Sequence, residues 1–203
     1  MIKNLIRSVT VKNLAVVTLC FVGFSAAQGQ TTPYTNPTGT PANNAANAPA
    51  NAPTAYDTLS QLRYQYNQAI QKLNALESFK SQVRGNIADC QTACTNAWAV
   101  LMRKHMDPTV TPAQFNALMA IYSNASILVN DACSASDDGS IAYNCAYNNL
   151  AAVYDLIINN PSQAGNGFSW VSLANRYIRD SNYYFNIAQP KFISATNLFN
   201  SIR

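Results

Sequence analysis

The chain has 203 residues, only 11% of them charged, and a formal net charge of +4. Three basic residues lie within the first 27 positions, so the remainder holds ten basic and nine acidic residues and is nearly neutral. This balance gives no overall electrostatic reason to bind nucleic acid or an anionic membrane. The single histidine, His105, and the single glutamate, Glu77, exclude a histidine-rich metal site and a di-iron carboxylate centre within one chain.

The first 27 residues have the three-part pattern of a cleaved secretory signal peptide. A basic start precedes an apolar core at 14–24, and small residues occupy 25–27. The apolar core is too short for a stable membrane span, and no later run approaches about 18 residues. We therefore predict export to the periplasm or the extracellular medium, without a transmembrane anchor. Acylation at Cys20, inside the apolar core, is the alternative interpretation of this segment.

Residues 28–55 form a segment rich in Pro, Ala, Asn and Thr with almost no large apolar side chains. Such a composition cannot bury enough apolar surface to offset the loss of chain entropy on folding. The sequence therefore predicts a disordered linker here, followed by one folded domain over 56–203.

From Thr58 onward, apolar residues recur at alternating spacings of three and four, which indicates one long helix with a coiled-coil-like seam. Thr58 and Gln61 form a capping box at its start, and Pro108 follows a basic last turn. Gly85-Asn86 could divide this helix, but the seam keeps its register there, which favours a single helix. Twelve of the fourteen seam positions are apolar, and they are 59, 62, 66, 69, 73, 76, 80, 83, 87, 90, 94, 97, 101 and 104.

The rest of the chain also has helical periodicity. A capping box with proline at the first helical position starts a second helix at Thr111. We expect a loop at 134–139, a third helix at about 140–159 and a fourth at about 168–188. Pro190 is expected to kink or restart this last helix. The predicted fold class is therefore all-α, an up-and-down helical bundle with one very long N-terminal helix.

Four cysteines remain after the signal peptide, and an even number in an exported chain indicates two disulfides. Up-and-down packing brings the four toward one end of the bundle. It favours the pairs Cys90–Cys133 and Cys94–Cys145 over the alternative Cys90–Cys145 with Cys94–Cys133. A bond between Cys90 and Cys94 within one helix would be strained. We therefore predict a bundle stapled by two disulfides.

The sequence contains no pattern of residues typical of catalysis. His105 with Asp107 is the only basis for a Ser-His-Asp arrangement, and no nucleophile elbow accompanies it. Asp137-Asp138-Gly139 lacks the alternating ligands of a calcium loop. We accordingly predict a chain that is not an enzyme, with no catalytic residue, no metal site and no cofactor.

Tyrosine and tryptophan favour half-buried positions and partner interfaces. Five such residues form a candidate protein-binding surface, namely Tyr143, Tyr147, Tyr154, Trp170 and Tyr177. The expected function is that of an exported helical binding or structural protein, an accessory component of a cell-envelope assembly, with self-association through the seam as one possibility. The alternatives are a fully secreted effector that acts on an extracellular or host partner and a carrier of a small molecule or lipid.

Overall fold

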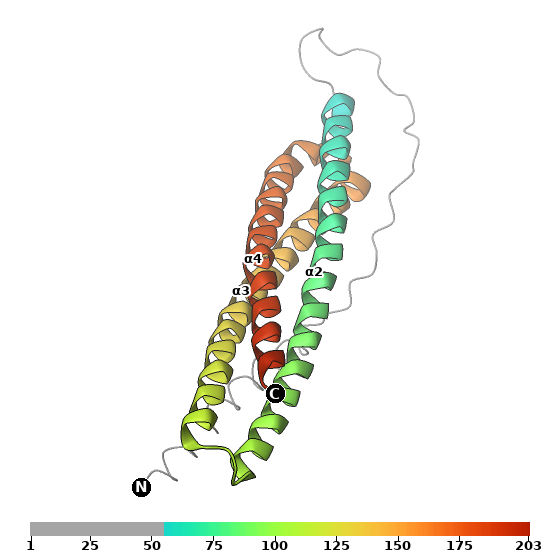
Figure 1. Cartoon of the computed structure of the whole chain (residues 1–203). Coiled ribbons are helices and arrows are strands. Elements are labelled where there is room, and N and C mark those ends of the chain that lie inside the picture. The colour runs from blue at the N-terminus through green and yellow to red at the C-terminus, as the bar shows by residue number, and fades with distance from the viewer. Residues whose placement is uncertain (1–54) are drawn as a thin grey trace. The chain divides into compact units, whose positions relative to one another are not determined.

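The computed structural model describes residues 55–203, which are almost entirely helical and contain no strand. Three long helices follow one another, namely α2 (Ala55–Met106), α3 (Pro112–Asn159) and α4 (Gly167–Ser201) (Figure 1). The short 3-10 helix η1 (Pro161–Asn166) precedes α4. The all-α helical bundle is confirmed, whereas the predicted signal peptide and most of the predicted linker lie outside the described residues.

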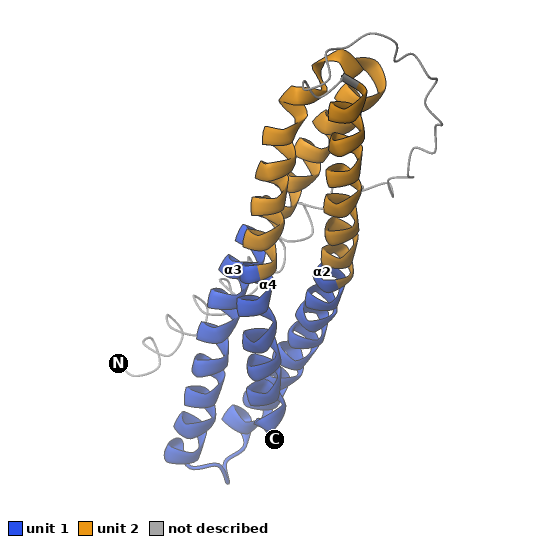
Figure 2. Cartoon of the chain, turned by 90° about the horizontal axis from the view of Figure 1, so that it is seen from above, with its two compact units in different colours: residues 1–29, 79–139, 183–203 blue, residues 30–78, 140–182 orange. Residues whose placement is uncertain are grey.

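The helices divide into two compact units (Figure 2). Among the described residues, unit 1 comprises 79–139 and 183–203, and unit 2 comprises 55–78 and 140–182. Each unit therefore contains a segment of each of the three long helices. Phe79 stacks edge-on against Phe185 in unit 1, with ring centroids 6.1 Å apart. Tyr66 contacts Tyr154 in unit 2, with centroids 6.3 Å apart.

Helix α2 is a single helix, as the seam predicts, and Gly85 does not interrupt it. All twelve seam positions from Leu62 to Leu101 are buried, including Lys80, which is 6% exposed. These side chains are buried within the chain itself. Helix α2 begins at Ala55, three residues before the predicted capping box at Thr58.

Helix α3 corrects the prediction of two helices separated by a loop at 134–139. It continues without a break from Pro112 to Asn159, so the bundle has three long helices. Ser and Gly in this segment are weak helix formers, but tertiary packing stabilises the helix. Ser136 is fully buried, and Gly139 lies so close to Phe185 that a Cβ atom there would be 2.8 Å from two ring carbons. The small residues at 134–139, which led to the prediction of a loop, instead permit close helix packing.

Two local sequence signals can be compared with the structure, the capping box at the start of α3 and Pro190 within α4. At the start of α3, the Thr111 backbone N–H donates to Gln114 Oε1 at 2.9 Å, and the Gln114 N–H donates to Thr111 Oγ1 at 3.3 Å. The predicted capping box is therefore confirmed. Pro190 does not end α4, because the buried positions Phe185, Phe192 and Phe199 continue at seven-residue intervals on both sides of it.

Candidate functional site

Two cysteines and one tyrosine form a buried polar contact in unit 1. Cys94 Sγ lies 3.3 Å from Tyr122 Oη, and Cys90 is hydrogen-bonded to the side chain of Thr196. The Tyr122 ring also packs against Trp98 on α2 and Phe199 on α4, with centroids 5.6 Å and 5.2 Å apart. This cluster joins the three helices of the unit and satisfies buried polar groups that would otherwise be costly.

The predicted disulfides are not present, because all four cysteines are free thiols. The Cys94–Tyr122 contact sets the register of antiparallel α2 and α3. From that point Cys90 lies four residues along α2, but Cys133 lies eleven residues along α3. The mismatch corresponds to roughly 10 Å at 1.5 Å per residue, whereas a disulfide needs Cα atoms about 4.4–6.8 Å apart.

The second predicted pair, Cys94–Cys145, depended on the loop at 134–139. Because α3 is continuous, Cys133 and Cys145 stand twelve residues apart on one helix, whereas Cys90 and Cys94 are only four apart. Two matching bonds cannot span such different spacings. The turn expected at 134–139, which would have folded the segment with Cys145 back toward Cys94, does not exist.

Burial makes the thiols of Cys90 and Cys94 poor nucleophiles. The pKa of Cys90 is raised to about 11, mainly by desolvation and in smaller part by the neighbouring Cys94, while the hydrogen bond with Thr196 opposes the rise. Desolvation also raises the pKa of Cys94, against the effect of its hydrogen bond with Tyr122. Burial raises the pKa of Tyr122 itself, so its hydroxyl stays protonated. A thiolate is the reactive form of cysteine, and here it is strongly disfavoured.

We expect the native chain to be alkylated first at Cys145, because its side chain is half-buried and the other three thiols are buried. At pH 8 a thiol of pKa about 11 is only roughly 0.1% thiolate, so Cys90 should react only after unfolding. Mass spectrometry of iodoacetamide-treated protein, before and after adding denaturant without reductant, measures this order. Cys145→Ser should remove the early adduct. Fewer than four modified thiols at 90, 94, 133 and 145 after unfolding would contradict the free-thiol structure.

His105 and Asp107, the residues considered for catalysis, each make a local contact at the turn between α2 and α3. His105 stacks on Phe115, with ring centroids 5.0 Å apart. Asp107 Oδ1 accepts hydrogen bonds from the Thr109 hydroxyl at 2.7 Å and the Thr109 N–H at 2.8 Å, which lower the pKa of Asp107. These contacts shape the turn between α2 and α3.

Asp137 and Asp138 form an adjacent acidic pair within α3. Burial raises the pKa of Asp137, and the adjacent Asp138 raises it further. Both residues lie within a continuous helix rather than in a loop. Among residues 56–203, no three or more His, Cys, Asp or Glu side chains gather as a metal-binding group.

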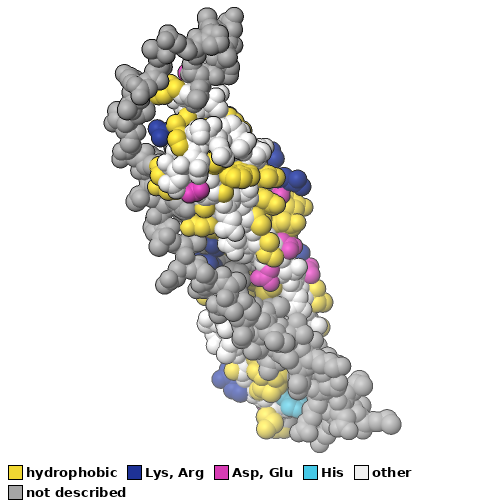
Figure 3. Space-filling view, turned by 180° about the vertical axis from the view of Figure 1, so that it is seen from behind, with side chains coloured by type: hydrophobic (Ala, Val, Ile, Leu, Met, Phe, Trp, Pro, Cys, Tyr) yellow, Lys and Arg dark blue, Asp and Glu magenta, His cyan; other side chains and the backbone are white. Residues whose placement is uncertain are grey.

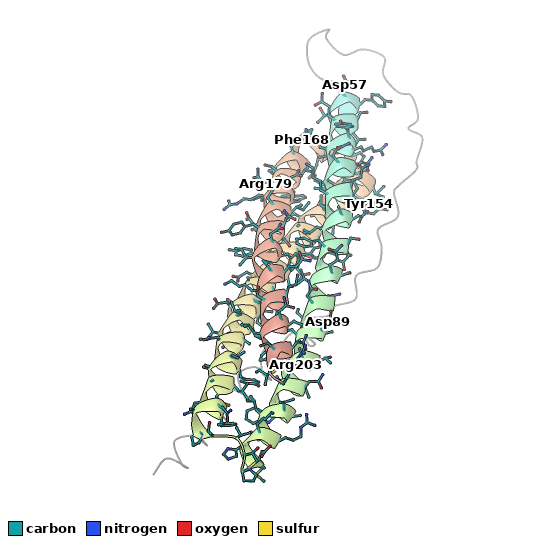
Figure 4. The ribbon with its side chains drawn as sticks, in the orientation of Figure 1. Asp57, Asp89, Tyr154, Phe168, Arg179 and Arg203 are labelled. Carbon is teal, nitrogen blue, oxygen red and sulfur yellow. The ribbon has the colours of Figure 1, made fainter. Side chains whose placement is uncertain are left out.

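The predicted aromatic surface lies entirely in unit 2. Tyr143 is only 4% exposed and belongs to the core, whereas Tyr147, Tyr154, Trp170 and Tyr177 are half-buried. Figure 4 labels Tyr154 on α3 and Phe168 near the start of α4.

Sequence reasoning missed two exposed aromatic residues of α2, Tyr56 at 47% exposure and Tyr64 at 66%. Both lie off the heptad seam. Because positions off the seam mostly face away from the other helices, the sequence could have identified both residues as exposed.

The face of the described residues drawn in Figure 3 has few charged side chains. Figure 3 shows hydrophobic side chains scattered among uncharged polar ones, with isolated Lys, Arg, Asp and Glu. No helix among the described residues is both long enough and apolar enough to cross a membrane. Comparison of the chain with family models, curated proteins and solved structures finds no match.

Proposed function

We propose that this chain is an exported, non-enzymatic helical protein that binds another protein of the cell envelope through aromatic residues of unit 2. One observation carries the proposal. Unit 2 has nine aromatic residues among its described positions, and seven of them remain half-buried or exposed. Those seven, called here the unit 2 aromatics, are Tyr56, Tyr64, Tyr147, Tyr154, Phe168, Trp170 and Tyr177.

Partly exposed tyrosine and tryptophan suit a protein interface because each combines a large apolar ring with a polar group that can face water. Protein interfaces are enriched in these residues and depleted in charge at their centres. The scarcity of charged residues in the chain, 11% overall, supports the same proposal. Its acid–base groups support it too, because His105 and Asp107 are engaged in local packing and turn contacts.

A photo-crosslinking experiment in the producing cell tests the proposal. Tyr64 and Tyr183 form a matched pair, since both are exposed tyrosines, at 66% and 63%, but Tyr64 belongs to unit 2 and Tyr183 to unit 1. A photoreactive phenylalanine analogue at position 64 should give a discrete protein adduct after irradiation, and the same analogue at 183 should not. Equal adducts from both positions, or none from any unit 2 aromatic, would refute the proposed surface.

Substitution of the same pair gives a quantitative prediction. An interface hot spot truncated to alanine costs about 2 kcal/mol or more, which is roughly a 30-fold loss of affinity. Once the crosslinked partner is isolated, Tyr64→Ala should weaken its binding by that order in a pull-down titration. Tyr183→Ala should leave the affinity within about twofold.

Fractionation of the producing cells separates this proposal from its alternatives. Recovery in a high-molecular-weight envelope fraction supports an accessory subunit of an envelope assembly. Recovery as a soluble species in the culture medium favours the secreted effector. Natively purified protein that releases a lipid or another small molecule on denaturation favours the carrier.

A further inference from the structure

The end of unit 1 at which α2 leads into α3 exposes an unusual set of apolar side chains. Met106 is 82% exposed and Met102 is 36% exposed, and their four-residue spacing places them on one helix face. Two residues nearby in the chain are half-buried, namely Val110 in the connection between α2 and α3 and Phe115 in the first turn of α3. These four residues are called here the apolar tip.

Helix α4 does not reach the apolar tip. Within unit 1, Phe79 contacts Phe185 and Cys90 contacts Thr196, so α2 and α4 run parallel in a fixed register. By that register the end of α4 at Ser201 is level with about Thr95, roughly three turns before the end of α2. Figures 1 and 2 both show the connection between α2 and α3 extending beyond the end of α4. Within residues 55–203, the last turn of α2 and the first turn of α3 therefore pack against each other and not against α4.

Positive charge surrounds the apolar tip. The last turn of α2 contains Arg103, Lys104 and His105, and the stack of His105 on Phe115 holds this turn against α3. Asp107 follows in the connection as an anion, because hydrogen bonds from the Thr109 hydroxyl and N–H and the charge of Lys104 lower its pKa, and it offsets part of this positive charge. The near-neutral charge of the whole chain thus conceals a local excess of cations next to exposed methionines.

We propose that the apolar tip docks on an anionic phospholipid surface, with Met102 and Met106 entering the headgroup region and Arg103 and Lys104 lying against the phosphates. Size favours lipid over an acidic protein. The four residues of the apolar tip are few beside the roughly 20–30 residues that each partner contributes to a stable protein interface. Interfacial binding to lipid, in contrast, depends on a small inserted apolar area combined with attraction to anionic headgroups. Methionine suits this role because it is unbranched and adaptable.

Vesicle flotation of the full chain tests this proposal. Vesicles of phosphatidylcholine with about 30 mol% phosphatidylglycerol should bind the protein, vesicles of phosphatidylcholine alone should bind it much more weakly, and roughly 0.5 M NaCl should release it. Met106→Asp should weaken binding more than tenfold because it removes an inserted apolar group and adds a repelled charge. Arg103→Gln with Lys104→Gln should weaken it about 25-fold, at about fivefold for each cation.

Two matched controls keep the test specific to the apolar tip. Ile127→Asp places the same charge at another exposed apolar position of unit 1, 57% exposed. Arg176→Gln with Arg179→Gln removes two exposed cations from unit 2. Both controls should float like the parent chain. The proposal is overturned if the parent does not prefer anionic vesicles, or if tip variants and controls bind alike, as they would if binding depended on residues outside the tip. The assay contains no second protein, so its outcome is independent of the crosslinking result.

Discussion

Phe185→Ala should lower the free energy of unfolding by about 3–5 kcal/mol, the usual cost of truncating a fully buried phenylalanine. The Phe185 ring is 0% exposed and meets the edge of Phe79 at an interplanar angle of 83°. It also covers the backbone of α3 at Gly139. Alanine would leave a cavity bordered by all three helices of unit 1, which cannot collapse without moving a helix. Urea denaturation followed by circular dichroism measures the change.

Tyr183→Ala is the control for this effect. It lies two residues earlier on the same helix but is 63% exposed, and its ring contacts only the neighbouring Tyr184 among the aromatic pairs of unit 1. Its effect on stability should stay within about 0.5 kcal/mol, as for most exposed positions. Similar losses from the two variants would mean that Phe185 is not part of a tightly packed core.

Gly139→Ala should destabilise the chain by about 1–3 kcal/mol, even though alanine is the better helix former by about 1 kcal/mol. A Cβ atom at this position would lie 2.8 Å from two carbons of the rigid Phe185 ring, so either the ring or the helix must shift. Thermal unfolding measures the loss as a lower Tm.

Gly85→Ala is the matched control, and it should have the opposite sign. Gly85 also lies inside a long helix, but nothing stands within 4 Å of the Cβ position. Alanine there should raise stability by about 0.5–1 kcal/mol through helix propensity alone.

A double variant tests the cause of the Gly139 effect. In a Phe185→Ala background the obstructing ring is absent, so Gly139→Ala should no longer be costly. The difference between the two backgrounds is the coupling energy of the contact. A loss of the same size in both backgrounds would contradict close packing as the reason for glycine at 139.

Local signals predicted α2 and the start of α3 well. The seam of α2 repeats over nearly seven heptads, so one or two exceptions such as Lys80 do not disturb the pattern, and its interior positions are indeed buried. The capping box at Thr111 and Gln114 forms as predicted because its hydrogen bonds join residues only three apart.

The same kind of reasoning failed at 134–139, and Pro190 does not restart the helix, which was one of the two expectations for it. There the local preference is for a loop or a helix break, but residues distant in sequence decide the outcome. Phe185 packs onto Gly139, and the buried phenylalanines on both sides of Pro190 hold α4 in one continuous stripe. Helical stability in proteins comes mostly from such packing rather than from propensity. The error in α3 accounts for the predicted pair Cys94–Cys145, whereas Cys90–Cys133 fails because the register between α2 and α3 separates the two residues.

The exposed residues of the candidate surfaces were also predicted only in part. Sequence reasoning selected Tyr147, Tyr154, Trp170 and Tyr177, which remain half-buried, but it could not separate them from Tyr143, which enters the core. It also gave no reason to select Met102 and Met106, whose exposure depends on α4 ending before the last turn of α2.

The sequence by itself determined the all-helical class, the long seam of α2 and the scarcity of groups suited to acid–base chemistry, because these follow from short-range periodicity and composition. Only the tertiary structure decided the number of helices, the separation of the thiols and the identity of the exposed apolar residues. Those features depend on the register between helices, which is set by contacts such as Cys94–Tyr122 and Gly139–Phe185 between residues far apart in the chain.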